Sequence, residues 1–482
     1  MRVLAIDQGT SATKAVVLDD DGSVLASHEA PVTPQAVAGG GVEQDPEQLW
    51  QSVIEAGRVA LARAGDGAGI DAVGFANQGE TVLAWDRATG SPLSTGVSWQ
   101  DRRAAAICAE LADDAEELTH LTGLPLDPYF AAPKMTWLRR HVTTAGVVTT
   151  SDAWLLHRLI GSYVTDVTTA SRTLLLDLAT RTWSPRACAA FGLDEADLPE
   201  VVGCAQAFGR TEAFGPSLLV SGLAVDQQAA LIGEHCLEAG ASKCTYGTGA
   251  FLLANAGPTA VASESGLAVS VAWQLDEGAA YCVDGQVYAA GAAIGWLQCW
   301  GFLRRPEDLD GVAASVDDNG GVTVVPALHG LGAPWWDPDA RASITGIGAA
   351  TQPAHVVRAT LEGLAAQVTL LARAAAADLG HPLGVLRVDG GLTRSRVLMQ
   401  LQADLLQVPL EVATTPHATA DGVGALARLG AGADAGAGMT LQDVLTRTEP
   451  SQRYEPTVSA TEAAERLARF EDGVARLEHF GS

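Results

Sequence analysis

A carboxylate and a glycine-rich turn in the middle of the chain could together act on a phosphoryl group. Asp226 and Gln227 follow the apolar run 218–224 and precede 228–236, a stretch of good helix formers, so we expect them at a strand-to-helix corner. Strands are expected at 242–246 and 250–255, with Gly247, Thr248 and Gly249 as the turn between them. Glycines allow positive φ and close backbone approach, and amides beside a threonine hydroxyl bind anionic oxygen. The pattern predicts a phosphate next to a general base.

The same kind of unit opens the chain. Strands are expected at 3–6 and 15–18, separated by the hydroxyl-rich turn Asp7-Gln8-Gly9-Thr10-Ser11-Ala12-Thr13-Lys14. Taken alone, an aspartate that opens a helix is most often an N-cap, and TYGTG is as often an ordinary hairpin turn. Two such hairpins far apart in sequence favour two halves that clamp one polyphosphate.

Composition indicates a globular protein with several full cores. The chain has 482 residues, 48% of them hydrophobic, which is enough for two or three domains. Its formal net charge of -27 argues against nucleic acid as a partner, so a phosphate ligand must be held by backbone amides, hydroxyls and a metal ion. We therefore expect any nucleotide to arrive with Mg²⁺.

Cysteine usage and the lack of long apolar runs predict a cytoplasmic protein. The 7 cysteines form no CxxC pair and no His/Cys cluster, which is typical of reduced thiols. The start MRVLAID enters an expected strand directly, which leaves no room for a signal peptide. No apolar run reaches the ~20 residues of a membrane span, so no membrane partner is expected.

In the first half of the chain, the expected strands and helices carry a set of polar residues at their ends. We expect a helix over 46–64, a strand over 71–76 that ends at Asn77-Gln78-Gly79-Glu80, and a hairpin partner for this strand over 82–86. The run Ser98-Trp99-Gln100-Asp101-Arg102-Arg103 is expected to open the next helix. Glu80, Trp99 and Asp101 are candidates for a polar ligand pocket. A structural salt bridge with Arg102 or Arg103 is an equally good interpretation of the two carboxylates.

The boundary between the halves is expected near 233–241, which gives domains of residues 1–236 and 237–482. In the second half, 291–297 opens a helix whose amino end could face a phosphate. Further helices are expected over 353–379, 396–406 and 461–477, and a strand over 385–388. This strand ends in Asp389-Gly390-Gly391, a turn that lets the backbone approach a ligand.

Many ordered blocks of this sequence are similar to one known family. They are DQGTSATK at 7–14, GETVLAWDRATG at 79–90, WQDRR at 99–103, LPLDPYF at 124–130, GLAVDQQAALIG at 222–233, TYGTGAFLLANAG at 245–257, GAAIGWL at 291–297, GLGAPWWDPDAR at 330–341 and VDGGLTRSRVLMQLQADLLQVP at 388–409. Over nearly its whole length the chain resembles the FGGY carbohydrate kinases, most closely their glycerol kinase branch. The resemblance implies two actin-like, ribonuclease-H-like α/β domains with the active site in the cleft between them, and ATP with Mg²⁺ as the phosphate source.

The resemblance also implies roles for individual residues. Asp226 matches the general base, and Asp7 matches the carboxylate that orients Mg²⁺ through water. The residues that match the polyol pocket are Gly79, Glu80, Trp99, Tyr129, Asp226, Gln227 and Phe251. Those that match the nucleotide and phosphate site are Thr10, Ser11, Thr13, Lys14, Thr248, Gly291, Gly295, Gly391 and Ser395.

Some positions depart from the glycerol kinase pattern. Gly79 stands where that branch has an arginine that contacts glycerol, and Val225 stands where it has a glycine before the base. Gly295 and Ser395 replace a glutamine and an asparagine. The missing arginine leaves a charge gap and free space, so we expect a four- or five-carbon polyol or ketose to outperform glycerol. By the same resemblance, segment 211–220 is shorter than in enterobacterial members of that branch and lacks their Gly-Lys-Gly-rich loop, so feedback by sugar phosphates through that loop is not expected.

The sequence therefore predicts ATP-dependent phosphorylation of a terminal hydroxyl on glycerol or a related small polyol or sugar. A ketopentose kinase of the xylulose or ribulose type stays open as an alternative, although its pocket motifs differ from the GET, WQDRR and DPYF blocks. The aromatic pocket argues against an ATP-driven conformational protein of actin-like fold. A sugar-sensing repressor would need a DNA-binding segment ahead of Asp7. The resemblance leaves a homodimer and a homotetramer open.

Overall fold

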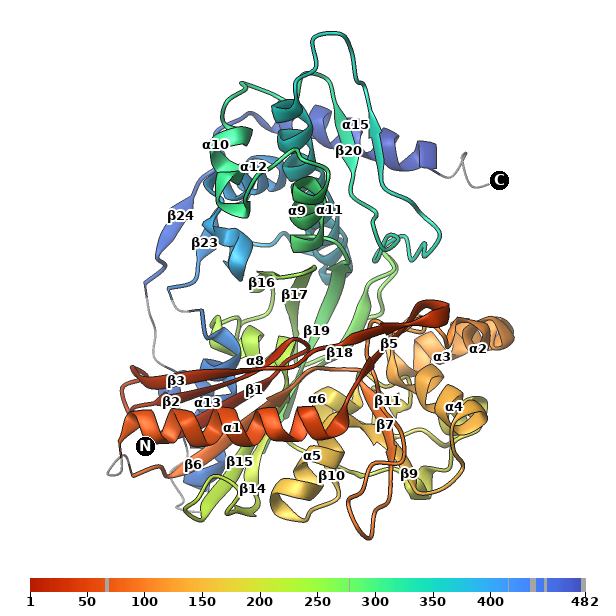
Figure 1. Cartoon of the computed structure of the whole chain (residues 1–482), viewed down its shortest axis with the longest axis vertical. Coiled ribbons are helices and arrows are strands. Elements are labelled where there is room, and N and C mark those ends of the chain that lie inside the picture. The colour runs from red at the N-terminus through yellow and green to blue at the C-terminus, as the bar shows by residue number, and fades with distance from the viewer. Residues whose placement is uncertain (66–68, 277, 415, 434–438, 446–448, 478–482) are drawn as a thin grey trace.

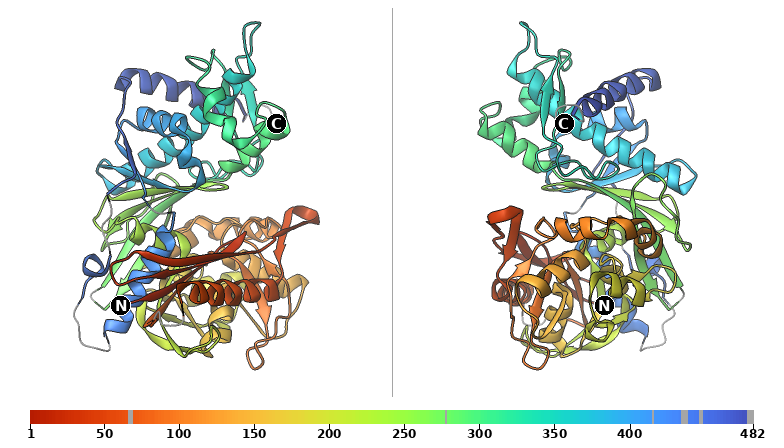
Figure 2. Two further views of the ribbon diagram at one scale, coloured as in Figure 1. Left: turned by 60° about the vertical axis from the view of Figure 1, so that its left-hand side comes forward. Right: turned by 90° about the vertical axis from the view of Figure 1, so that its right-hand side faces the viewer.

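The protein consists of two α/β domains, each organised around its own β-sheet (Figure 1, Figure 2). The structure, a computed structural model, describes residues 1–65, 69–276, 278–414, 416–433, 439–445 and 449–477. In Figure 1 the lower domain holds the start of the chain and a six-stranded sheet, and α15 (Ala460–Leu477) lies in the upper domain.

The first sheet combines an antiparallel meander with two parallel strands. Its order is β14-β15-β6-β1-β2-β3, with β1 antiparallel to β2, β2 antiparallel to β3, and β6 and β15 parallel to β1. The apolar run of β1 is fully buried, as expected for a strand covered on both faces. The strands are β1 (Val3–Gln8), β2 (Ala12–Leu18), β3 (Val24–Pro31), β6 (Ala72–Asn77), β14 (Ala205–Thr211) and β15 (Leu218–Val225).

The second sheet repeats this topology. Its order is β18-β19-β17-β16-β22-β23-β24, in which β16, β17 and β19 form the antiparallel meander and β22 and β23 run parallel to β16. The expected pair of α/β domains is thereby confirmed. The strands are β16 (Ser242–Tyr246), β17 (Ala250–Gly257), β18 (Ala268–Leu275), β19 (Gly278–Val287), β22 (Leu386–Asp389), β23 (Leu410–Val412) and β24 (Gln452–Tyr454).

Helices cover both sheets. The longest begin as their sequences predict: α1 follows the cap of Asp45, whose side chain accepts from the Glu47 amide, and has Pro46 at its first position. The larger helices are α1 (Pro46–Ala64), α4 (Ala131–His141), α5 (Ser151–Ile160), α8 (Asp226–Gly233), α9 (Gly291–Cys299), α11 (Pro353–Leu379), α12 (Arg396–Leu406), α13 (Ala418–Ala433) and α15. Shorter ones are α2 (Ala105–Glu110), α3 (Ala115–Thr122), α6 (Val167–Ala170), α7 (Pro185–Phe191), α10 (Leu309–Ala313) and α14 (Leu441–Val444).

Helix α13 comes late in the chain but packs on the first sheet, against β15, β6 and β1, and beside α8. Glycines make this contact close. A Cβ atom at Gly422 would lie 1.8 Å from the Ala229 carbonyl oxygen, and one at Gly74 would lie 2.4 Å from that of Val423. The first domain is therefore completed by a helix from the far end of the sequence.

A third sheet in the lower domain corrects one expectation. Residues 82–86 were expected to form a hairpin with 71–76, but β6 lies between β1 and β15, so both of its edges are already paired. Strand β7 (Val82–Trp85) pairs instead with β8 (Gly96–Val97) and β9 (Val147–Thr150). Glu80 has a left-handed φ of 57°, which turns the chain out of the first sheet. The helix expected from residue 98 begins later, at α2.

The remaining strands are short. Strands β4 (Gln35–Val37) and β5 (Gly41–Gln44) complete the third sheet, and the other pairs are β10 (Val164–Asp166) with β13 (Glu200–Val202), β11 (Leu176–Asp177) with β12 (Thr182–Trp183), and β20 (Thr323–Val325) with β21 (Ser343–Thr345). Within the described parts of the chain, every helix is too short or too polar to cross a bilayer. All the cysteines are described, and each is a free thiol.

Candidate active site

One cavity of about 260 Å³ is lined by both glycine turns. The β1–β2 turn and the β16–β17 turn belong to different domains, so the cavity lies between the domains. Most of the residues predicted for the polyol and phosphate sites line it, namely Thr10, Ser11, Glu80, Trp99, Tyr129, Asp226, Gln227, Thr248 and Phe251.

Asp226 is held at the corner between β15 and α8, where the sequence predicts it. Its Oδ1 accepts a hydrogen bond of 2.7 Å from the Gln227 amide. Burial raises the pKa of Asp226 to about 7, the charges of Asp7 and Glu80 raise it further, and Lys243 opposes them. A carboxyl group with a pKa near neutrality suits general-base catalysis.

Aromatic rings form one wall of the cavity. The Trp99 ring meets Tyr129 and Phe251 edge to face, with centroid distances of 5.8 Å and 5.9 Å. Trp99 Nε1 donates a 2.8 Å hydrogen bond to Thr10 Oγ1, which ties this wall to the first glycine turn. Rings in such a wall cover the C–H surface of a polyol and exclude water from it.

Buried Lys134 holds the loop that carries Tyr129. Its ammonium donates to three backbone carbonyls, those of Pro128 at 2.9 Å, Phe130 at 2.6 Å and Tyr129 itself. Burial lowers the pKa of Lys134 to about 7, against the charges of Glu80, Asp101 and Asp127. The position of the Tyr129 ring thus depends on a cation bound inside its own loop.

Two charged residues in the cavity wall were not identified from the sequence. Arg172 Nε donates to Glu80 Oε1 at 2.7 Å, and its Nη1 donates to Asp284 Oδ2 at 2.5 Å. Burial lowers the pKa of the guanidinium, but Asp284 and Glu80 outweigh it, so the pKa of Arg172 stays above its ordinary value. A signal was present in β19, where Asp284 stands inside a run that is otherwise uncharged, and charge in such a run indicates a buried polar partner.

The second glycine turn is fixed against helix α9. The Gly291 amide donates to the Gly247 carbonyl at 3.0 Å, and the Ala290 amide donates to that of Thr248 at 2.9 Å. A Cβ atom at Gly249 would lie 2.6 Å from the Val287 carbonyl oxygen. Gly247 and Gly249 do not have the positive φ that the sequence suggested, so close packing rather than turn geometry requires glycine at 249.

A neighbouring cavity of about 400 Å³ contains the residues predicted for the metal and part of the nucleotide site. Asp7, Lys14 and Gly391 line it together with Asp389, and Thr245 lines both cavities. Burial raises the pKa of Asp7 to about 6, Lys14 opposes this rise, and Asp389 adds to it. Lys14 Nζ also donates to the Pro416 carbonyl at 3.2 Å.

Other predicted residues lie outside both cavities. Thr13 is fully buried and its hydroxyl bonds to Ser52 at 2.6 Å, because Thr13 and Lys14 are consecutive in β2 and face opposite sides. Ser395 is the N-cap of α12, where its Oγ accepts from the Leu398 amide at 3.1 Å. Gly295 is exposed on α9, and Gly79 is buried behind Val225. Gly291 supports the turn without lining either cavity.

The salt bridge that the sequence left open for Asp101 is present. Asp101 is fully buried and its Oδ2 lies 2.6 Å from Arg103 Nη2. Its Oδ2 also accepts from the Val42 amide at 2.9 Å, so this carboxylate supports the loop rather than facing the cavity. Glu80, by contrast, lines the cavity.

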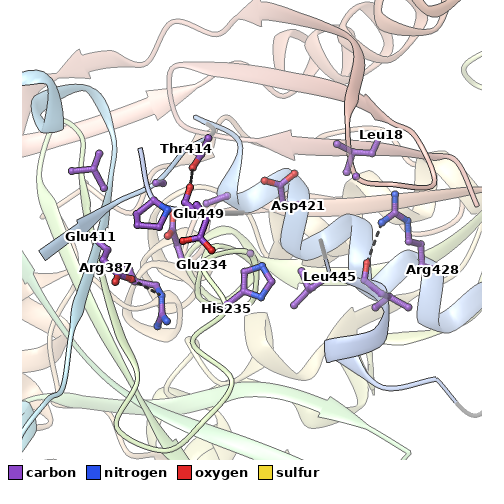
Figure 3. A pocket seen from close by; sticks show the side chains of 17 residues that line it. Leu18, Glu234, His235, Arg387, Glu411, Thr414, Asp421, Arg428, Leu445 and Glu449 are labelled. Atoms are coloured by element: carbon purple, nitrogen blue, oxygen red, sulfur yellow. Dashed lines mark hydrogen bonds and ion pairs between the residues drawn. The ribbon is translucent and has the colours of Figure 1, made fainter. Parts of the chain in front are cut away.

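A further cavity, of about 140 Å³, contains none of the predicted residues (Figure 3). Figure 3 shows Glu234 and His235 in its middle, with Arg387 and Arg428 at opposite sides. Burial raises the pKa of Glu234 to about 8, and Asp389 adds to the rise. Among the described residues of the β1–β2 and β16–β17 turns, none lines this cavity.

The chain matches a known family over most of its length. The model of the FGGY family of carbohydrate kinases, N-terminal domain, matches residues 2–233, and that of the C-terminal domain matches residues 242–431. The chain is 40% identical over 490 residues to the glycerol kinase of Alkalilimnicola ehrlichii, covering 98% of both chains.

Solved structures show the same fold. The crystal structure of Plasmodium falciparum glycerol kinase with ADP has a TM-score of 0.90 and 29% identity, and the match covers 99% of this chain and 98% of that one. A xylulose kinase from Rhodospirillum rubrum has a TM-score of 0.87 and 24% identity, covering 100% of this chain and 99% of that one, which is a likeness of fold alone.

Proposed function

The chain belongs to the FGGY family of carbohydrate kinases, and on that premise we propose that it transfers the γ-phosphoryl group of ATP to a terminal hydroxyl of glycerol, with Asp226 as the general base. It is an ATP-dependent kinase of glycerol or a related small polyol or sugar. The observation that carries the proposal is that Asp226 shares one cavity with both glycine turns and an aromatic wall.

The proposed reaction needs one proton acceptor. Asp226 Oδ2 forms no hydrogen bond with the described residues and is not sealed from solvent, so it is available to a substrate hydroxyl. The hydroxyl oxygen bonds to the γ-phosphorus as its proton passes to Asp226, and the bond from phosphorus to the bridging oxygen breaks to leave ADP. Amides of the two turns and the hydroxyls of Thr10 and Thr248 hold the phosphates.

We propose that Asp7 and Asp389 hold Mg²⁺, which supplies positive charge to the phosphates when it is bound. Asp389 Oδ1 is buried without a hydrogen bond among the described residues, and the pKa of Asp389 is raised by burial. Among the described residues, the only group of three or more His, Cys, Asp or Glu side chains close enough to share a metal ion is Asp19, Asp20 and Asp21, of which the last two are exposed. One or two carboxylates plus phosphates and water are the usual ligands of Mg²⁺ at kinase sites, which fits Asp7 and Asp389.

Two observations favour glycerol over a longer acceptor. The space expected beside Gly79 is narrowed by Val225, whose Cγ2 would lie 3.0 Å from a Cβ atom at residue 79. The expected charge gap is filled by the guanidinium of Arg172 next to Glu80. The preference for a four- or five-carbon acceptor, predicted from the sequence, stays a prediction and is the competing outcome of the test.

The test is ADP release from ATP and Mg²⁺ with a panel of acceptors. Glycerol, erythritol, ribitol, xylulose and ribulose are compared by kcat/KM, with a reaction that contains no acceptor as the control. Glycerol should give the highest value, and release without acceptor should be negligible because the closed site excludes water. A ketopentose as the best acceptor would establish the xylulose-type alternative, and acceptor-independent release would indicate an ATP-driven conformational protein.

We also propose a cytoplasmic location and a homodimer or homotetramer. The free thiols fit a reducing compartment, and ATP is the phosphate donor there. Light scattering on the purified protein measures the oligomeric state, and a monomer at micromolar concentration would exclude both assemblies.

A further inference from the structure

Arg172 joins the two domains at the wall of the cavity. It follows α6 in the first domain and contacts Glu80 of the same domain through Nε. Through Nη1 it reaches Asp284 on β19 and, at 3.5 Å, Ser270 on β18, which both belong to the second sheet. The rings of Phe130 and Tyr129 lie 5.2 Å and 5.9 Å from its guanidinium carbon. Its orientation is therefore fixed from several sides.

Each member of this group keeps one polar atom for a ligand. Among the described residues, Arg172 Nη2, Glu80 Oε2 and Asp284 Oδ1 make no hydrogen bond, and none of the three atoms is sealed from solvent. All three residues line the cavity and are at most 5% exposed, so the exposed atoms open into it. One donor group between two acceptors matches a hydroxyl, which both donates and accepts.

The group lies at the deep end of the cavity. Arg172, Glu80 and Asp284 are almost fully buried, whereas Asp226 and the second glycine turn around Thr248 are partly exposed. The hydroxyl that receives the phosphoryl group must lie beside Asp226 and the turns. The opposite end of a bound polyol therefore points toward Arg172.

Residue 79 cannot take this role. Gly79 has no side chain, and the position that its Cβ atom would occupy is 3.0 Å from Val225 Cγ2. Val225 lines the cavity and precedes the base directly. A side chain at 79 would therefore press on the Val225 side chain, next to Asp226 in the cavity wall.

We infer that Arg172 and Asp284 bind the terminal hydroxyl at the end of the substrate that is not phosphorylated, and thereby select a three-carbon polyol with hydroxyls at both ends. This inference rests on the proposed function and adds two residues to its substrate site. Because the hydroxyl is contacted from both domains, the same pair makes substrate binding depend on the domains being closed.

The test compares two acceptors that differ only in that hydroxyl. Propane-1,2-diol is glycerol without one terminal hydroxyl, so it keeps the reacting end and loses the end assigned to Arg172. In Arg172→Lys and Asp284→Asn, kcat/KM for glycerol should fall about 10- to 100-fold, the cost of a charged hydrogen bond. The value for propane-1,2-diol should stay close to that of the wild type.

Arg172→Lys retains the positive charge, so neither carboxylate is left without a cation. Thermal unfolding and ATP binding are measured for both variants to confirm that each is folded. If Arg172→Lys does not fold, Asp284→Asn provides the same comparison, because the amide keeps the shape of the carboxylate. Because asparagine and aspartate have nearly the same shape, the Asp284→Asn variant tests the loss of hydrogen bonding rather than a change in packing.

An equal loss on glycerol and propane-1,2-diol would overturn the inference, since it would mean that Arg172 and Asp284 only support the pocket. An unchanged value for glycerol would overturn it too. Failure of the proposed function would give a different result from failure of this inference, because the wild-type protein would then phosphorylate neither glycerol nor propane-1,2-diol.

Discussion

Asp226 is suited to proton transfer by its surroundings rather than by its residue type. An exposed aspartate has a pKa near 4 and is a weak base at neutral pH. Burial and the charges of Asp7 and Glu80 raise the pKa of Asp226 to about 7. We predict that Asp226→Asn lowers kcat by about 10²- to 10⁴-fold while ATP still binds, because the amide keeps the shape but accepts no proton.

Single-turnover kinetics and ATP titration check this prediction together. Asp113→Asn is the control, since it makes the same carboxylate-to-amide change at an exposed residue that lines neither cavity. If Asp226→Asn keeps a tenth of the wild-type rate, another group must accept the proton.

The pH dependence of the reaction follows from the same carboxyl group. The base acts when ionised, so kcat/KM should rise with pH through about 7 and level off above it. Lys243, whose Nζ lies 2.5 Å from Gln227 Oε1, lowers the pKa of Asp226 by its charge. Lys243→Met should therefore move the midpoint of the profile to higher pH. A midpoint that does not move would show that a different group controls the acid limb.

The side-chain volumes at positions 79 and 225, next to Asp226, are expected to depend on each other. A side chain at 79 meets Val225 Cγ2, so Gly79→Arg alone should cost about 1–3 kcal/mol of folding free energy through overpacking. Val225→Gly in the same chain should recover most of that loss. Urea unfolding of the single and double variants measures the coupling between the two positions. Additive losses would mean that the two side chains do not compete for space.

Residue types and spacing could predict the position of Asp226, a pocket role for Trp99 and both glycine turns, and the family resemblance added Tyr129 and Phe251, but neither indicated Arg172. The residues found from the sequence stand in local patterns, at strand ends or in glycine turns. Arg172 pairs with Glu80 across 92 positions and with Asp284 across 112. The fold of the first domain brings Arg172 to Glu80, and the packing of the two domains brings it to Asp284, so no local pattern indicates either pairing.

At the scale of elements, the two glycine hairpins have the same topology but different supports. In the first, Thr10 accepts from Trp99 at 2.8 Å and so joins the first glycine turn to the aromatic wall. In the second, the Thr248 carbonyl accepts from the Ala290 amide, and the exposed hydroxyl is free to meet phosphate. Variants of Thr10 and Thr248 should therefore differ in which substrates they bind less tightly.

We predict that Thr248→Val raises the KM for ATP alone, whereas Thr10→Val raises the KM for both ATP and the acceptor. Each lost hydroxyl contact to a charged phosphate should cost about 1.5–3 kcal/mol. Initial rates over a grid of both substrate concentrations separate the two constants. Should Thr10→Val leave the acceptor KM unchanged, its bond to Trp99 does not shape the polyol site.

Helix α13 shows why some helices cannot be predicted from local sequence alone. The stretch ATADGVGALARLGAGA contains several glycines, which disfavour a helix, and no helix was predicted there. In the structure the glycines allow backbone contact with the first sheet and with α8. The energy of that packing outweighs the propensity, and only the tertiary structure contains it.

Gly422→Ala tests this contact. Although alanine favours a helix, its Cβ atom would lie 1.8 Å from the Ala229 carbonyl oxygen, so the variant should lose at least about 1–3 kcal/mol of stability. Gly348→Ala is the control, because Gly348 is exposed with no atom within 4 Å of its added Cβ. Thermal unfolding of both variants is the measurement. Equal midpoints would mean that α13 moves at no cost to relieve the clash.

At the scale of the whole molecule, charge sets the response to pH. The chain carries a formal net charge of -27, and several of its carboxyl groups are buried. The pKa of Asp7 is raised to about 6, and that of Asp226 to about 7, in both cases first by burial. Asp152, deep in the first domain, has its pKa raised to about 6 by burial and by Asp166.

These carboxyl groups bind protons more tightly in the folded protein than in the unfolded chain. Stability must therefore fall as pH rises from about 4, the unfolded pKa, to about 7, the highest folded pKa of the three. We predict a lower unfolding midpoint at pH 8 than at pH 5.5, at constant ionic strength. Asp152→Asn should raise the unfolding midpoint at pH 8 and make stability depend less on pH, because the amide occupies the same position as the carboxyl group but carries no charge. The Oδ1 atom of Asp152 has no hydrogen bond among the described residues. If the wild-type midpoint instead rises between these two pH values, groups with lowered pKa dominate the folding of this protein.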